Sequence, residues 1–144
     1  MVVVMNTLTP RIVVAGADRA IDFYRSVFDA ELIERFADPS GHVIHAALKI
    51  RDAVIALTEE RAEWHNHAPP SLSGSPVILN LVVDDVDAVT ARMVEAGAEE
   101  VFAVNDQFYG HREGRFRDPF GHLWIITTIV EKLTAVEIEA RMRG

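Results

Sequence analysis

The sequence predicts an α+β fold in which two β-α-β-β-β modules form one domain spanning residues 1–144. A chain of this length is sufficient for one compact domain with an apolar core. The order of strand-like and helix-like segments in residues 9–58 recurs in residues 77–130. Between them, residues 59–76 hold prolines and a Ser/Gly cluster, which is typical of a connection. Because one module cannot cover its own sheet, we expect the two modules to pair.

The first module follows from apolar periodicity. Residues 10–14 are short, apolar and β-branched, which indicates a strand. A helix is expected from residue 17, because apolar side chains then recur at helical spacing, at Ala20, Phe23, Tyr24, Val27 and Phe28. Three further strands are expected at residues 31–36, 42–49 and 53–58, with an Asp-Pro-Ser-Gly turn at 38–41. The connection that follows holds one predicted helical turn, near residues 60–64.

The second module repeats this order. Residues 77–83 form a strongly apolar strand, and acidic residues 84, 85 and 87 then begin a helix that ends at Gly97. Strands are expected at residues 101–104, 114–117 and 122–129. The last two are joined by Asp118-Pro119-Phe120-Gly121, a type I turn. Thr134 and Glu137 have capping-box spacing and begin a terminal helix over residues 135–143.

Composition excludes several classes of function. The net charge of −8 argues against a nucleic-acid partner, because binding to a phosphate backbone normally needs a basic face. The absence of cysteine excludes disulfides, thiolate metal sites and thiol catalysis. No apolar run approaches the roughly 20 residues that cross a bilayer, and the apolar residues 1–5 lack the features of a signal peptide. We therefore expect a cytoplasmic protein with no membrane partner.

One motif carries a family resemblance. Residues 109–124 read Tyr-Gly-x-Arg-x-Gly-x-x-x-Asp-Pro-Phe-Gly-His-x-Trp, and residues 45–50, 69–76, 83–88 and 96–98 fit the same pattern. With the doubled module order, the chain resembles the vicinal oxygen chelate superfamily. That superfamily includes glyoxalase I, extradiol dioxygenases, fosfomycin-resistance enzymes and bleomycin-resistance proteins. The resemblance implies that each sheet curls into half of a cup, with its helix outside, and that the chain forms a homodimer.

The resemblance also implies where a metal would be bound. Active members hold a divalent ion with His, Gln or Glu from the first and last strands of the modules. In this chain those positions fall at Thr9, Ala56, Ile78 and Ile125, none of which is His, Gln, Asp or Glu. We therefore expect no metal or other cofactor at the usual site. A divalent metal would need a displaced site, with ligands such as His65 and His67.

Strand alternation predicts a mainly apolar cup. Ile78 and Asn80 in one strand, and Leu123, Ile125 and Thr127 in another, should face the cup, whereas Trp124 should lie in the core. Aromatic residues in the adjoining segments would stack on a flat ligand or plug the cup or a dimer interface: Phe108, Tyr109 and Trp64. Two further side chains are candidates for ligand contact, namely His45, which alternation can direct into the cup, and Arg112, which could instead fix its loop by pairing with a nearby carboxylate.

The sequence therefore favours a glyoxalase-like or bleomycin-resistance-like protein that binds a small hydrophobic or aromatic molecule without the usual metal site. The alternative is a metal-dependent lyase or isomerase of the glyoxalase type with a displaced site. In that enzyme the ligands or the general base would come from His45, His65, His67, His111 or Glu113. A second alternative is a structural or partner-binding module whose cup is filled by its own side chains.

Overall fold

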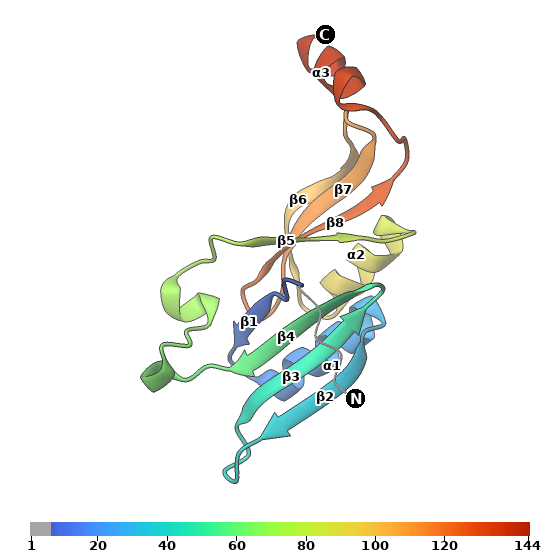
Figure 1. Ribbon diagram of the computed structural model, residues 1–144. Coiled ribbons are helices and arrows are strands. Elements are labelled where there is room, and N and C mark those ends of the chain that lie inside the picture. Colours follow the sequence, from blue (N-terminus) through green and yellow to red (C-terminus); the bar gives the residue numbers. More distant parts are fainter. Residues whose placement is uncertain (1–6) are drawn as a thin grey trace. The chain divides into compact units, whose positions relative to one another are not determined.

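The computed structural model describes residues 7–144 and divides into two compact units, residues 1–71 and 72–144 (Figure 1). Each unit contains one of the predicted modules. Residues 1–5, for which we expect no signal peptide, lie outside the described residues. Within residues 7–144 no helix has both the length and the apolar character that a bilayer crossing requires. The pairing of the two modules in one domain stays a prediction.

The first unit is a four-stranded sheet with one helix. Its elements are β1 (Arg11–Val14), α1 (Ala17–Phe28), β2 (Glu31–Ala37), β3 (Val43–Ile50) and β4 (Ala53–Glu59). The strand order is β1-β4-β3-β2, with β1 parallel to β4 and the other neighbours antiparallel. Helix α1 packs against β2, β3 and β4. Two short 3-10 turns follow, Ala62–Trp64 and Pro69–Leu72, where one helical turn was predicted.

The second unit repeats the topology of the first. Its elements are β5 (Ile78–Val82), α2 (Val86–Glu95), β6 (Glu99–Asp106), β7 (His111–Arg117), β8 (Leu123–Ile129) and the terminal helix α3 (Ala135–Arg143). The strand order β5-β8-β7-β6 corresponds strand by strand to that of the first unit. Helix α2 packs on β6, β7 and β8, which leaves the opposite face of the sheet free of helices from its own unit. The predicted doubled β-α-β-β-β arrangement and the α+β class are confirmed.

The hairpin of β6 and β7 is longer than predicted. Strands were expected at residues 101–104 and 114–117, with a loop at 105–112 between them. In the structure, Asp106 pairs with Arg112 and the amide of Gln107 donates to the carbonyl of His111 at 2.7 Å. The connection therefore shrinks to residues 107–110. The ends of these strands were not predicted because their residues are polar and show no apolar alternation. An antiparallel strand at the edge of a sheet accommodates polar side chains.

The Asp118 turn is the anchor of the second core, as the sequence predicts. The Oδ1 atom of Asp118 accepts hydrogen bonds from the amides of Phe120 at 2.9 Å and His122 at 3.0 Å. Its Oδ2 atom accepts the indole N–H of Trp124 at 2.9 Å. Trp124 is buried on the α2 side of the sheet, which confirms its core position. The turn therefore fixes the register of β7 against β8, and with it the side chains that share each face.

Candidate functional site

Strand register gathers one set of side chains on the face of the second sheet that lies away from α2. Across β7 and β8, Glu113 pairs with Thr127 and Arg115 with Ile125, and across β5 and β8, Asn80 pairs with Ile125. Because side chains alternate along a strand, these five lie opposite the buried Trp124. We call this surface the helix-distal face, defined by Asn80, Glu113, Arg115, Ile125 and Thr127.

A pocket of about 410 Å³ opens over part of the helix-distal face. Its walls come from β6, the 107–110 turn, β7 and β8. Apolar or aromatic surface and polar groups both line it, through Phe102, Ala103, Asn105, Gln107, Tyr109, Glu113, Gly114, Arg115 and Ile125. Its size is in the range that binds small organic molecules. All of its lining residues belong to the second unit.

A buried carboxylate lies at one side of this pocket. Glu113 is only 8% exposed, and its two oxygens accept hydrogen bonds from two hydroxyl groups. The Tyr109 hydroxyl donates to Oε1, and the Thr127 hydroxyl donates to Oε2 at 2.9 Å. The Nδ1 atom of His111 lies 4.0 Å from Oε1. Burial raises the pKa of Tyr109 to about 12, and the hydrogen bond and charge of Glu113 add to the increase, so this tyrosine is a neutral donor at ordinary pH.

The 107–110 turn positions Tyr109. Gly110 has a φ of 87°, and a Cβ atom there would collide with the backbone oxygen of Glu131, so no other residue fits without movement. Arg141 of α3 donates to the carbonyl of Phe108 at 2.9 Å and pairs with both oxygens of Glu131, at 2.9 and 3.0 Å. Figure 1 shows α3 at the end of the sheet where β6 turns into β7. The terminal helix therefore fixes the turn that carries Tyr109.

Arg115 places a guanidinium group at the pocket, and one of its nitrogen atoms lacks a hydrogen bond in the part of the chain that the structure describes. Its Nε is buried and has no hydrogen-bond partner within the described residues 7–144. The carbon of its guanidinium group lies 5.2 Å from the centroid of the Phe102 ring, within the range of a cation–π contact. Buried donors in folded proteins are nearly always paired, so this atom requires an explanation.

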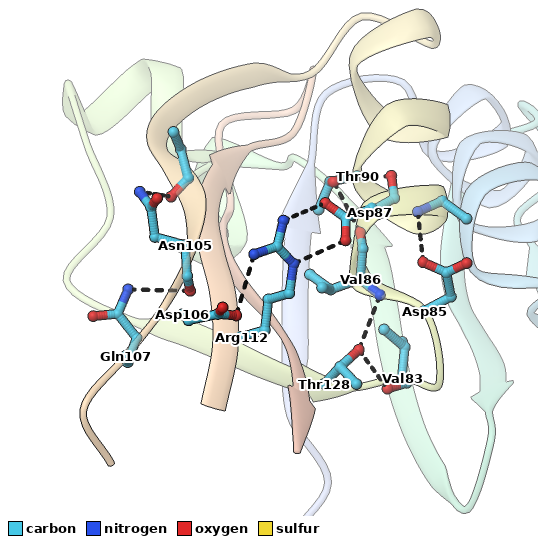
Figure 2. Close-up of polar contacts among 12 residues, drawn as sticks. Val83, Asp85, Val86, Asp87, Thr90, Asn105, Asp106, Gln107, Arg112 and Thr128 are labelled. Carbon is cyan, nitrogen blue, oxygen red and sulfur yellow. Dashed lines mark hydrogen bonds and ion pairs between the residues drawn. The ribbon is translucent and has the colours of Figure 1, made fainter. Parts of the chain in front are cut away.

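Arg112, a predicted ligand contact, points to the other side of the sheet (Figure 2). Its guanidinium binds Asp87 through two hydrogen bonds of 2.9 and 3.0 Å, and Asp106 at 3.2 Å. The Arg112 hydrogen bonds lower the pKa of Asp87. Arg112 pairs across the sheet with Thr128, whose hydroxyl accepts the amide of Val86 at the start of α2. Of the two roles considered for Arg112, the structure shows pairing with carboxylates rather than ligand contact, because alternation places its side chain on the opposite face from Glu113.

The other predicted contacts are distributed over both units. Ile78 and Leu123 face the same way as Ile125, but neither is among the described residues that line the pocket. Phe108 is half exposed and meets the Tyr109 ring edge to face at 5.1 Å. In the first unit, Trp64 is half exposed, and the guanidinium of Arg61 lies 4.1 Å from its ring centroid.

His45, also in the first unit, lies between two charged side chains. Its Nδ1 is 2.8 Å from an Arg11 nitrogen, and its Nε2 is 3.0 Å from a Glu34 oxygen. Its ring stacks on Phe36 at 5.9 Å. Both ring nitrogens are therefore already occupied by side chains of its own unit, so neither is available to a metal in this arrangement.

Strand register shows the neighbours of two of the four positions tested for a metal. Asn80 lies beside Ile125, and Arg11 lies beside Ala56. Neither pair supplies the carboxylate and imidazole donors that divalent ions need. Among residues 7–144, no group of three or more His, Asp or Glu side chains is placed to hold a metal ion. The residues at these four positions do not fit the metal that the resemblance implies.

A second pocket, of about 470 Å³, lies in the first unit and contains His67, one of the two histidines suggested for a displaced metal site. Its charged groups are already engaged with neighbours. Glu60 accepts the amide of Ala68, which lowers the pKa of Glu60, and Arg61 pairs with Asp38 at 2.8 Å.

Sequence reasoning missed Phe102 and Arg115 as pocket residues, and it named Glu113 only as an alternative base or metal ligand. The signal was present in the Asp118–Gly121 turn. Counting outward from a tight turn pairs Arg115 with Ile125 and Glu113 with Thr127, so the cup-facing assignment of Ile125 also assigned its neighbours. Phe102 carried no such signal, because a register shift interrupts the pairing of β6 with β7 on each side of it.

Comparison with known proteins agrees with the topology. The model of the Glyoxalase/Bleomycin resistance protein/Dioxygenase superfamily matches residues 4–126. An uncharacterised protein of Mycobacterium bovis is 41% identical over 138 residues, which cover 94% of this chain and 91% of that protein. A gene product of Arabidopsis thaliana has a TM-score of 0.68 at 26% identity, covering 85% of this chain and 98% of its own. TioX from Micromonospora sp. ML1 has a TM-score of 0.66 at 25% identity, and the match covers 87% of this chain and 99% of the TioX chain. The chain belongs to the glyoxalase/bleomycin resistance protein/dioxygenase superfamily.

Proposed function

We propose that this protein binds a small, flat organic molecule in the pocket on the helix-distal face, and that it does so without a metal ion. The observation that carries the proposal is the position of Ile125. An apolar side chain stands where the resemblance implies a metal ligand, and it lines a pocket that Phe102 and Tyr109 also line. Such a surface favours dispersion and stacking contacts with an aromatic ring over chelation by a charged diol.

The polar groups of the pocket would orient the molecule. Tyr109 and Glu113 are already bound to each other, and Asn105 and Gln107 add amide groups at the β6 end of the pocket. The lining is more polar than the mainly apolar cup that the sequence predicts, and a few placed polar groups are what orients a ligand in a small-molecule site. A module filled by its own side chains would leave no such hollow, so the volume of about 410 Å³ argues for a ligand-binding role.

Benzyl alcohol is a suitable first probe, because it is flat, neutral and small enough for the pocket. Two-dimensional amide NMR of protein treated with a chelator should show saturable shifts at Gly114 and Ile125 as benzyl alcohol is added. An Ile125→Trp substitution would fill the pocket from the floor, and we expect it to abolish these shifts.

Val82→Trp is the matched control, because Val82 lies on an edge strand of the same sheet and does not line the pocket. This variant should bind as the natural chain does. Shifts that map to the first unit, or that survive in Ile125→Trp, would contradict the assignment of the pocket.

A further inference from the structure

The guanidinium of Arg115 indicates what the ligand carries. Its Nε atom has no hydrogen-bond partner among residues 7–144, whereas buried donors in folded proteins are nearly always paired. Arg115 lines the pocket, so a bound molecule can contact its side chain. The Phe102 ring packs against the guanidinium and helps to fix its plane.

Glu113 is the nearest acidic residue along the strand, but its oxygens are directed elsewhere. It is two residues from Arg115 on the same strand face, about 7 Å along β7. Oε1 accepts from Tyr109 and Oε2 accepts from Thr127, so two hydroxyl groups hold this carboxylate and disperse its charge. The arrangement keeps a carboxylate and a guanidinium in one pocket without an ion pair of 4.0 Å or less between them.

From this we infer that the natural ligand of the pocket is an aromatic carboxylate, whose ring lies against Phe102, Tyr109 and Ile125 and whose carboxylate pairs with Arg115. A guanidinium binds a carboxylate through two parallel N–H···O bonds, which its two terminal nitrogens can supply. The inference rests on the proposed function, and it adds the charge and chemical class of the ligand to it.

Three probes with the same ring and nearly the same shape test the inference: benzoate, neutral benzamide and cationic benzamidine. Their affinities are measured by amide NMR on the full chain at low ionic strength, where an ion pair is least screened. We expect benzoate to bind about tenfold more tightly than benzamide, which corresponds to about 1.4 kcal/mol for the charge-assisted pair.

Substitution of Arg115 identifies the group responsible. Arg115→Gln should reduce the ratio of benzoate to benzamide affinity to about one. Arg115→Lys should give an intermediate ratio because it keeps the charge without the planar fork. Arg117→Gln is the control, since Arg117 lies on the same strand, is exposed and pairs with Glu99 at 3.1 Å. It removes the same charge outside the pocket and should leave the ratio unchanged.

The outcomes separate this inference from the proposed function. If benzamide binds but benzoate has no advantage, or if benzamidine binds most tightly, the inference is wrong while the proposed function stands. The same holds if the advantage of benzoate survives Arg115→Gln. If none of the three probes binds, both are overturned.

Discussion

The hydroxyl of Thr127 donates to the Oε2 atom of Glu113 at 2.9 Å, across the pairing of β8 with β7. Both residues are buried, and Thr127 is fully enclosed. The contact, together with the Tyr109 hydroxyl, holds a carboxylate at the pocket by neutral donors rather than by an arginine. This arrangement explains how Glu113 and Arg115 line the same pocket without pairing with each other.

Thr127→Val removes the donor and keeps the shape of the side chain. Because a hydrogen bond to a charged group contributes about 1.5–3 kcal/mol, we expect the free energy of unfolding in urea to fall by that amount. Thr127→Ser retains the hydroxyl, so its free energy of unfolding should fall by less than that of Thr127→Val. A Thr127→Val protein as stable as the natural chain would show that this contact does not hold Glu113.

Tyr109 should ionise near pH 12, because burial raises its pKa and Glu113 adds to the increase. The chain has two tyrosines, so the difference between the tyrosinate absorbance of the natural chain and of Tyr109→Phe isolates this group. Glu113→Gln should shift the midpoint down toward 10, the ordinary value. A Tyr109 midpoint near 10 in the natural, folded chain would contradict the buried hydrogen bond.

The same group makes a pH-dependent contribution to stability, with a definite sign. The folded-state pKa of Tyr109 is raised, so the folded chain keeps a proton that the unfolded chain has lost between pH 10 and about 12. The stabilisation from Tyr109 is complete below pH 10 and is lost as the pH rises toward 12. Urea unfolding across this window should show a steeper decline for the natural chain than for Tyr109→Phe.

Arg112→Ala tests the assignment of this arginine to the fold. Its pair with Asp87 is partly exposed, at 34% and 59% of the two side chains, so we expect only a small loss in unfolding free energy. Binding of benzyl alcohol should not change, because the side chain lies on the α2 side of the sheet. Arg112→Lys keeps the charge but loses the two-point contact, and it should recover only part of the stability. A change of tenfold or more in benzyl alcohol affinity would show that Arg112 contributes to ligand binding.

Arg141→Ala tests the link between α3 and the turn that carries Tyr109. Loss of the contacts to Phe108 and Glu131 should raise the hydrogen-exchange rates of the Gly110 and Glu131 amides, since both amides lie in the part of the chain that Arg141 holds. Arg143→Ala removes the same charge from the same helix and is the control. Equal exchange rates in the two variants would show that α3 does not stabilise the turn.

The sequence predicted the fold well because its signals are local. Apolar periodicity, the Asp118 turn and the Thr134 cap each act within a few residues, and the structure places a strand, a turn or a helix at each of them. The extent of β6 and β7 was missed because their ends are polar and are specified by pairing with each other rather than by their own residues.

The site was harder to predict, because it depends on which face each side chain takes. Ile125 was assigned to its face from alternation alone, whereas for Arg112 the sequence left two roles open, ligand contact and pairing with a carboxylate. The partners of Arg112, Asp87 and Asp106, are distant from it in sequence or lie across a hairpin whose register the sequence did not specify. The unpaired state of the Arg115 Nε atom is a property of packing, and no sequence pattern signals it.

The central claim is that binding in the pocket needs no metal, and chelation tests it most directly. Benzyl alcohol affinity is measured for protein as purified, for protein made metal-free with a chelator, and for metal-free protein given Zn²⁺, Mn²⁺ or Ni²⁺. We expect the same affinity in every case, because Ile125 and its neighbour Asn80 supply no donor set for an ion. Binding that disappears on chelation and returns with one of these ions would contradict the account.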